Sequence, residues 1–64
     1  MTGTISDVHR ERGIGHILGA DGKVYLFRRN ALQDAWFHEL QMGDAVTFEP
    51  GADLRATLVR RTRD

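Results

Sequence analysis

The residues best suited to contact a ligand lie close together, between positions 12 and 17, where the chain reads Arg-Gly-Ile-Gly-His-Ile. A glycine inside a strand indicates a bulge or a close approach of another group to the backbone. Because successive side chains of a strand point to opposite faces, Ile14 and His16 share one face. We therefore expect a strand that a ligand approaches closely, with Ile14 and His16 displayed and Arg12 at its start.

The charges are unevenly spread along the chain, although nine Lys and Arg residues balance nine Asp and Glu residues. A net charge of zero argues against a strong polyanion binder. Cations predominate in an early stretch: Arg10, Arg12, Lys23, Arg28 and Arg29. Residues 30–54 contain only acidic charges, and four more arginines follow: Arg55, Arg60, Arg61 and Arg63. A two-sided molecule follows if the fold joins the two basic stretches; otherwise these are ordinary solvated charges.

Catalytic and metal-binding patterns are weak. The histidines, His9, His16 and His38, match no compact ligand motif, and nothing in the sequence places them together, so we expect neither a metal site nor a cofactor. Asp7 with His9 and His16 is the nearest approach to an acid–base cluster. No nucleophilic triad and no phosphate-binding loop before a helix is present. We predict that the chain is not an enzyme and takes no small-molecule substrate.

Length and composition indicate a single domain over residues 1–64, near the lower size limit for a self-sufficient core. The chain has no cysteine, which suits a reducing compartment. No apolar run approaches the roughly 20 residues of a membrane span, and the first residues do not form a signal peptide. We therefore expect a cytoplasmic protein without a membrane partner.

Short strand signals bounded by turns recur along the chain. We predict strands over residues 4–9, 13–18, 23–28, 45–49 and 55–61. Ile5 and Val8 are the inward residues of the first strand, and their spacing of three predicts a bulge or a strong bend. An Asp-Gly dipeptide marks the turn after the second strand. Asn30 is a candidate cap of one helical turn before a long loop.

This pattern predicts an all-β fold. Five short strands with one longer connection between the third and the fourth outline an OB-fold, a small five-stranded Greek-key barrel that is partly open. Closing the sheet limits the exposed strand edges. The predicted core is Ile5, Val8, Ile17, Tyr25, Phe27, Leu32, Leu40, Val46, Phe48 and Val59. Tyr25 and Phe27 are thus expected inside the barrel and not on its surface.

Four stretches resemble the cold-shock domain family. Residues 3–9 and 12–17 lie where the family has Gly-x-Val-Lys-Trp-Phe-Asn and Lys-Gly-Phe-Gly-Phe-Ile. Residues 24–32 lie where it has Asp-Val-Phe-Val-His-Phe-Ser-Ala-Leu. Residues 40–49 read Leu-Gln-Met-Gly-Asp-Ala-Val-Thr-Phe-Glu, where it has Leu-x-x-Gly-x-x-Val-x-Phe-Glu. No gap is needed from residue 24 to residue 49, and the resemblance covers essentially the whole chain.

The resemblance implies binding of single-stranded RNA or DNA, by stacking of bases on exposed aromatic rings and by a basic groove. In this chain most of those rings are replaced. The positions that differ are Asp7, Ile14, His16, Leu26, Arg28 and Arg29. Phe37, in the long loop, keeps its ring. Since each base stack is worth about 1–3 kcal/mol, the binding should be weak, mainly electrostatic and poorly sequence-specific.

The first hypothesis is therefore a cold-shock-like binder of single-stranded nucleic acid. Its expected contact residues are Arg12, Ile14, His16, Leu26, Arg28, Arg29 and Phe37. The alternative is a protein-interaction module or homodimer that uses the same face. In that case Ile14 and Leu26 form an aliphatic patch and Asp7 discourages nucleic acid. Trp36 and Phe37 then supply the aromatic anchors common in protein interfaces.

Several residues admit two interpretations at this stage. His16 is either a ligand contact or an ordinary surface histidine, and Arg28-Arg29 is either a contact or a solvated pair. Trp36-Phe37 either caps the barrel or forms an exposed apolar contact site. The arginines after residue 54 either extend the basic surface or keep the end of the chain soluble.

Overall fold

The structure is a computed structural model that describes residues 1–33 and 39–62. Within these ranges the chain forms one antiparallel sheet of five strands, in the spatial order β3-β2-β1-β4-β5. The elements are β1 (Thr2–His9), β2 (Ile14–Gly19), β3 (Val24–Arg28), η1 (Arg29–Ala31), β4 (Ala45–Pro50), η3 (Ala52–Leu54) and β5 (Ala56–Arg61). The predicted strands are confirmed, with ends that differ by at most two residues.

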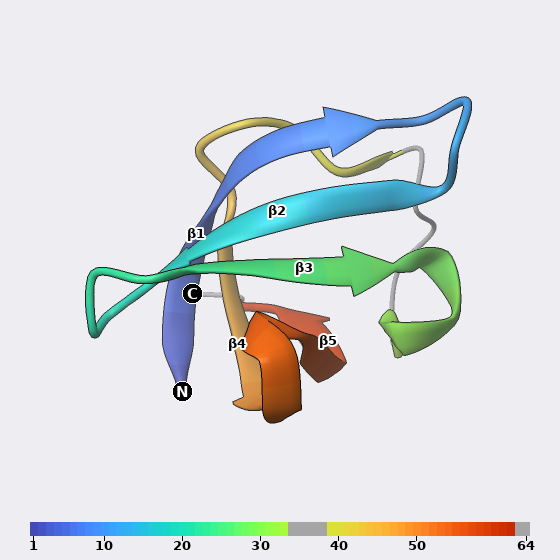
Figure 1. The fold of residues 1–64 in the computed structure, drawn as a ribbon. Coiled ribbons are helices and arrows are strands. Elements are labelled where there is room, and N and C mark those ends of the chain that lie inside the picture. Colours follow the sequence, from blue (N-terminus) through green and yellow to red (C-terminus); the bar gives the residue numbers. More distant parts are fainter. Residues whose placement is uncertain (34–38, 63–64) are drawn as a thin grey trace.

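The sheet is curled into a half-barrel, as Figure 1 shows, with β3 in green and β5 in red at its two ends. These edge strands approach each other through two isolated parallel bridges, Leu26 with Arg55 and Leu32 with Val59. The predicted all-β fold is thereby confirmed. Because residue 55 lies next to residue 26, the second basic stretch reaches the edge of β3. No helix in the described part of the chain is both long enough and apolar enough to cross a membrane.

A bulge in β1 lets both Ile5 and Val8 face the interior. The pairing of β1 with β2 joins Ile5 to Ile17 and then Asp7 to His16, so the register shifts between Ile5 and Asp7. An extra residue of this kind bends the strand and increases its twist. The predicted bulge is confirmed, and it turns Asp7 to the outer face opposite His16.

The core agrees closely with the predicted set. The buried apolar residues are Ile5, Ile17, Tyr25, Phe27, Leu40, Val46, Phe48, Ala56 and Val59. Val8 and Leu32, which were predicted to be buried, are only partly buried and pack against this cluster. Ala56 was not predicted, because a single alanine in a basic segment carries little hydrophobic signal.

The close approach to the backbone that is observed at Gly15 of the Gly-x-Gly motif comes from inside the barrel. A Cβ on Gly15 would lie 2.6 and 2.7 Å from Cε1 and Cζ of Phe27 and 3.0 Å from the carbonyl oxygen of Asp7. Gly15 and Phe27 are cross-strand partners on the buried face. Gly13 has a positive φ of 68°, which favours glycine at the turn before β2. In this motif Gly15 therefore makes room for the Phe27 ring, and Gly13 allows the turn before β2.

Asn30 does not cap the helical turn, contrary to expectation. The turn η1 begins at Arg29, and its N-cap is Arg28, whose side chain makes no capping hydrogen bond. The backbone N–H of Arg29 instead donates to the carbonyl oxygen of Gly13, at 2.8 Å. This bond attaches the start of η1 to the β1–β2 turn.

The turn between β2 and β3 is held by Asp21. The Tyr25 hydroxyl donates to Asp21 Oδ2 at 2.6 Å, and the Lys23 backbone N–H donates to Oδ1 at 3.1 Å. The Tyr25 bond, followed by the Lys23 bond, lowers the pKa of Asp21 below its ordinary value of 3.8. The same bond to Asp21 raises the pKa of Tyr25 above 10.0. Tyr25 thus combines a buried ring with a hydrogen-bonded hydroxyl.

Tyr25→Phe is expected to lower stability in a pH-dependent way. A carboxyl group whose pKa is lower in the folded than in the unfolded chain stabilises the fold at pH values above its ordinary pKa. This contribution disappears as the pH falls through the lowered pKa. The wild-type chain should therefore be more stable than Tyr25→Phe at neutral pH, and the difference should shrink below about pH 3.8. Urea unfolding of both chains between neutral and acid pH measures this, and a constant difference would contradict it.

Candidate functional site

The outer face of β1, β2 and β3 carries a grid of side chains that is set by the strand register. Asp7 lies opposite His16, and His16 lies opposite Leu26. One step along, His9 lies opposite Ile14, and Ile14 lies opposite Arg28. Four residues predicted as contacts are therefore on one face: Ile14, His16, Leu26 and Arg28. The face is continuous because alternate residues of a strand lie on the same side.

The same face continues into an aliphatic stripe that the sequence analysis did not include. Leu18 pairs with Val24 in the next row of β2 and β3, and their exposed fractions are 46% and 47%. Together with the half-buried Ile14 and Leu26, they give this face an apolar character. Alternation alone could have found Leu18, which lies two residues beyond His16.

Asp7, His9 and His16 form a side-chain cluster on this face. His9 Nε2 lies 2.9 Å from Asp7 Oδ2, and His16 Nδ1 lies 4.0 Å from the same oxygen. The two imidazole rings meet edge to face, with centroids 5.9 Å apart. The expectation that nothing would place His9 and His16 together is therefore wrong. His38 lies outside the described residues.

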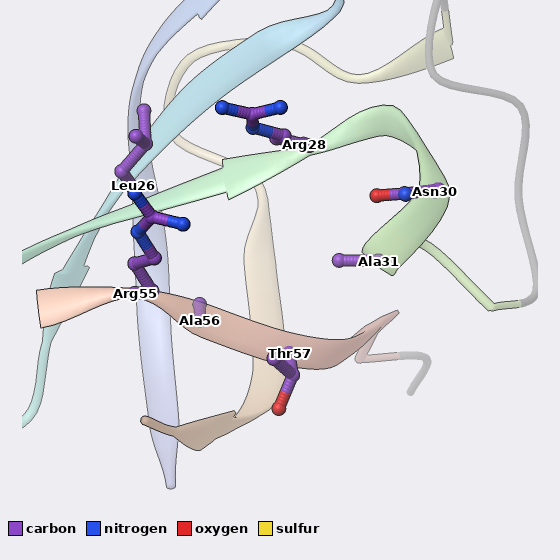
Figure 2. A pocket seen from close by; sticks show the side chains of 7 residues that line it. All are labelled: Leu26, Arg28, Asn30, Ala31, Arg55, Ala56 and Thr57. Atoms are coloured by element: carbon purple, nitrogen blue, oxygen red, sulfur yellow. The ribbon is translucent and has the colours of Figure 1, made fainter. Parts of the chain in front are cut away.

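A small hollow of about 150 Å³ continues the outer face beyond the edge of β3. Its lining residues are Leu26, Arg28, Asn30, Ala31, Arg55, Ala56 and Thr57. Figure 2 shows Arg55 next to Leu26 on the left of the hollow and Arg28 above it, with Asn30 and Ala31 facing it from η1. Pockets for drug-sized ligands are larger, roughly 300–1,000 Å³. The hollow suits a phosphate or one planar group beside apolar side chains.

Arg55 is the cation that sequence reasoning left undecided. The parallel bridge of Arg55 with Leu26 brings it to the edge of β3, beside Arg28 in the lining of the hollow. At this one position the second basic stretch lies beside the first, whereas Arg61 lies 3.8 Å from Asp44. Only the closure of the sheet reveals this, because residues 26 and 55 are far apart in the sequence.

The other predicted cations lie at one end of the grid. Arg12 is exposed in the turn between β1 and β2. Arg29 begins η1, and its guanidinium nitrogen lies 3.3 Å from where a Cβ on Gly13 would be. Arg10 of the same turn donates to the carbonyl oxygen of Leu40 at 3.0 Å and so holds the chain before β4. Arg12 and Arg29 thus flank the end of the face that carries Arg28.

Phe37, the predicted loop contact, lies outside the described residues, as does its neighbour Trp36. The choice between a cap on the barrel and an exposed apolar contact site therefore stays a prediction.

Comparison with known proteins adds no family assignment. No protein-family model matches the chain, and no curated protein matches it significantly.

Proposed function

We propose that this protein binds single-stranded RNA or DNA, weakly and mainly through charge, as a cold-shock-like OB-fold domain. The observation that carries the proposal is the joining of Arg28 and Arg55 at one hollow beside Leu26. Arginine guanidinium groups bind phosphates and also stack on bases, and an adjacent apolar surface accepts a base face. One arginine from each of two basic stretches that are separate in the sequence thereby lines the same hollow.

The topology supports the finer fold assignment within this proposal. The strand order β3-β2-β1-β4-β5 supports it, as do the isolated parallel bridges of Leu26 with Arg55 and of Leu32 with Val59, which bring the two ends of the sheet together. OB-type barrels bind oligonucleotides on the face of their second and third strands. In this chain that face carries Ile14, His16, Leu26 and Arg28.

The composition of the face explains why weak binding is expected. Base–aromatic stacking contributes about 1–3 kcal/mol per base, and the described part of this face offers imidazole rings and no larger aromatic ring. Phosphate contacts by arginine replace part of that free energy, in a form that salt screens. Asp7, whose side chain is 47% exposed, places a negative charge among the contact residues. The expected ligand is therefore held without strong base preference.

The proposal is tested by fluorescence anisotropy with labelled single-stranded RNA and DNA oligonucleotides, pyrimidine-rich and mixed, at two salt concentrations. Saturable binding that is micromolar or tighter and weakens with salt is the expected result. A duplex of the same sequence is the control, and it should bind more weakly because its bases cannot reach the apolar side chains. Absence of binding at low salt would refute the proposal.

Asp7→Asn is expected to strengthen this binding. The change removes one negative charge from the face and keeps the side-chain oxygen that accepts the Val8 backbone N–H at 2.9 Å. With screening by solvent and salt, the gain in affinity should be about two- to fivefold at low salt. The same anisotropy titration of both chains measures the change in affinity. Asp53→Asn, in the exposed η3 turn, is the matched control and should change the affinity less.

A second function is favoured by one specific observation, the aliphatic stripe of Ile14, Leu18, Val24 and Leu26. Such a stripe suits a protein interface or a homodimer, where a buried apolar centre is surrounded by charges. Sedimentation of the wild-type chain and of Leu18→Ser over a range of concentrations distinguishes this function. Self-association that Leu18→Ser abolishes, together with no nucleic-acid binding, would support it.

A further inference from the structure

The cluster of Asp7, His9 and His16 has the composition of a metal site, although no spacing in the sequence indicates one. The strand register creates it, since Asp7 and His16 are cross-strand partners and His9 is two residues beyond Asp7 on the same face. Directly opposed residues have Cβ atoms about 4.5–5.5 Å apart, so their side-chain tips can meet at one point. One ligand atom from each of the three residues lies within 4.8 Å of the others.

The Asp7 carboxylate is already oriented for this role. Its Oδ1 accepts the Val8 backbone N–H at 2.9 Å, which leaves Oδ2 facing His9 Nε2 at 2.9 Å and His16 Nδ1 at 4.0 Å. A hydrogen bond to the oxygen that does not bind the metal fixes a carboxylate ligand in many metal sites. The cross-strand partner of His9 on β2 is Ile14 and that of His16 on β3 is Leu26, so both histidines have an apolar neighbour in the grid.

The donor set selects the kind of ion. Two imidazoles and one carboxylate suit Zn²⁺ and similar transition-metal ions, whereas Mg²⁺ and Ca²⁺ prefer oxygen ligands. Donors around a tetrahedral Zn²⁺ with bonds of about 2.0 Å are about 3.3 Å apart. Small rotations of the two half-exposed histidine side chains would bring the three donors to that spacing.

We propose that Asp7, His9 and His16 bind one divalent transition-metal ion, with Zn²⁺ as the probe ion. Three protein donors leave at least one coordination position for water or another ligand. Binding exchanges the 2.9 Å contact between His9 Nε2 and Asp7 Oδ2 for one bond from each of these atoms to the ion. The site does not depend on the function proposed above, because it needs no nucleic acid.

The test is calorimetric titration of the wild-type chain with Zn²⁺. A pH of about 7.5 is chosen because side chains bind a metal ion only in their deprotonated form. One equivalent should bind, and Mg²⁺ should give no saturable signal. His9→Ala and His16→Ala should each weaken Zn²⁺ binding by at least about tenfold. His38→Ala, which removes the remaining histidine of the chain, is the matched control and should leave the affinity unchanged.

A second measurement on the wild-type chain avoids any failure of the variants to fold. In NMR spectra of the histidine rings, Zn²⁺ should shift the signals of His9 and His16 together and saturate at one equivalent. No saturable Zn²⁺ binding would overturn the proposal, as would equal affinity in His16→Ala or shifts confined to His38. Because these experiments contain no nucleic acid, their failure is distinct from failure of the proposed function.

Discussion

Replacing Arg28 and Arg55 together by alanine should weaken binding of single-stranded RNA by about 10- to 100-fold at low salt. Each lost charge-assisted hydrogen bond is worth roughly 1.5–3 kcal/mol, and new contacts of the phosphates with water and salt ions offset part of this loss. Both side chains line the same hollow and reach it from opposite edges of the curled sheet. Each phosphate contact on a single strand adds about 0.7 to the slope of log affinity against log salt. The double variant should therefore lose about 1.4 from that slope.

The matched control is Arg60→Ala, which changes an exposed arginine of β5 that does not line the hollow. Its effect on the affinity for RNA should be small and should not depend on the RNA sequence. Arg28→Ala and Arg55→Ala made singly should each lose about half of the slope change. Equal losses for Arg60→Ala and Arg55→Ala would mean that net charge, and not the hollow, sets the affinity. Unchanged affinity in the double variant would remove both arginines from the interface.

Gly15→Ala should destabilise the fold by about 1–3 kcal/mol, a large part of what so small a domain has to lose. The added Cβ would lie 2.6 Å from Cε1 of Phe27, whose ring is 1% exposed in the core. The ring cannot easily move away, because it is buried within the hydrophobic core cluster. Urea unfolding monitored by circular dichroism measures the loss in stability.

Gly51→Ala is the control for this effect. Gly51 has a negative φ of −114°, and a Cβ there would meet only the carbonyl oxygen of Arg55, at 3.2 Å. Its cost should be clearly smaller. In a double-mutant cycle, Phe27→Leu should cost stability alone but cost less in the Gly15→Ala background, because the smaller side chain relieves the clash. Strict additivity would show that the ring is not the cause.

The candidate site could be predicted from the sequence as far as alternation reaches. Ile14, His16, Leu26 and Arg28 lie on one face as expected, because residues two apart in a strand share a side. The bulge in β1 could also be predicted, since Ile5 and Val8 can both face inward only if one extra residue intervenes. Local rules of this kind need no knowledge of the rest of the chain.

Alternation also has a limit that Gly15 illustrates. The sequence shows that this position lacks a side chain, but two reasons for a missing side chain look the same in the sequence. A ligand outside the sheet and a ring inside the barrel both require space at the backbone. Only the packing of Phe27 against Gly15 decides between them.

By itself, the sequence determined the all-β class, the strands, most of the core and the exposed face of β2 and β3, because these depend on period-2 patterning and on turn residues that act within a few positions. The tertiary structure alone decided which distant residues became neighbours. The pairing of β1 with β2 joined Asp7 to His16, and the curl of the sheet brought Arg55 to Leu26. Such contacts depend on register and closure, which the whole core specifies together. No local pattern contains that information.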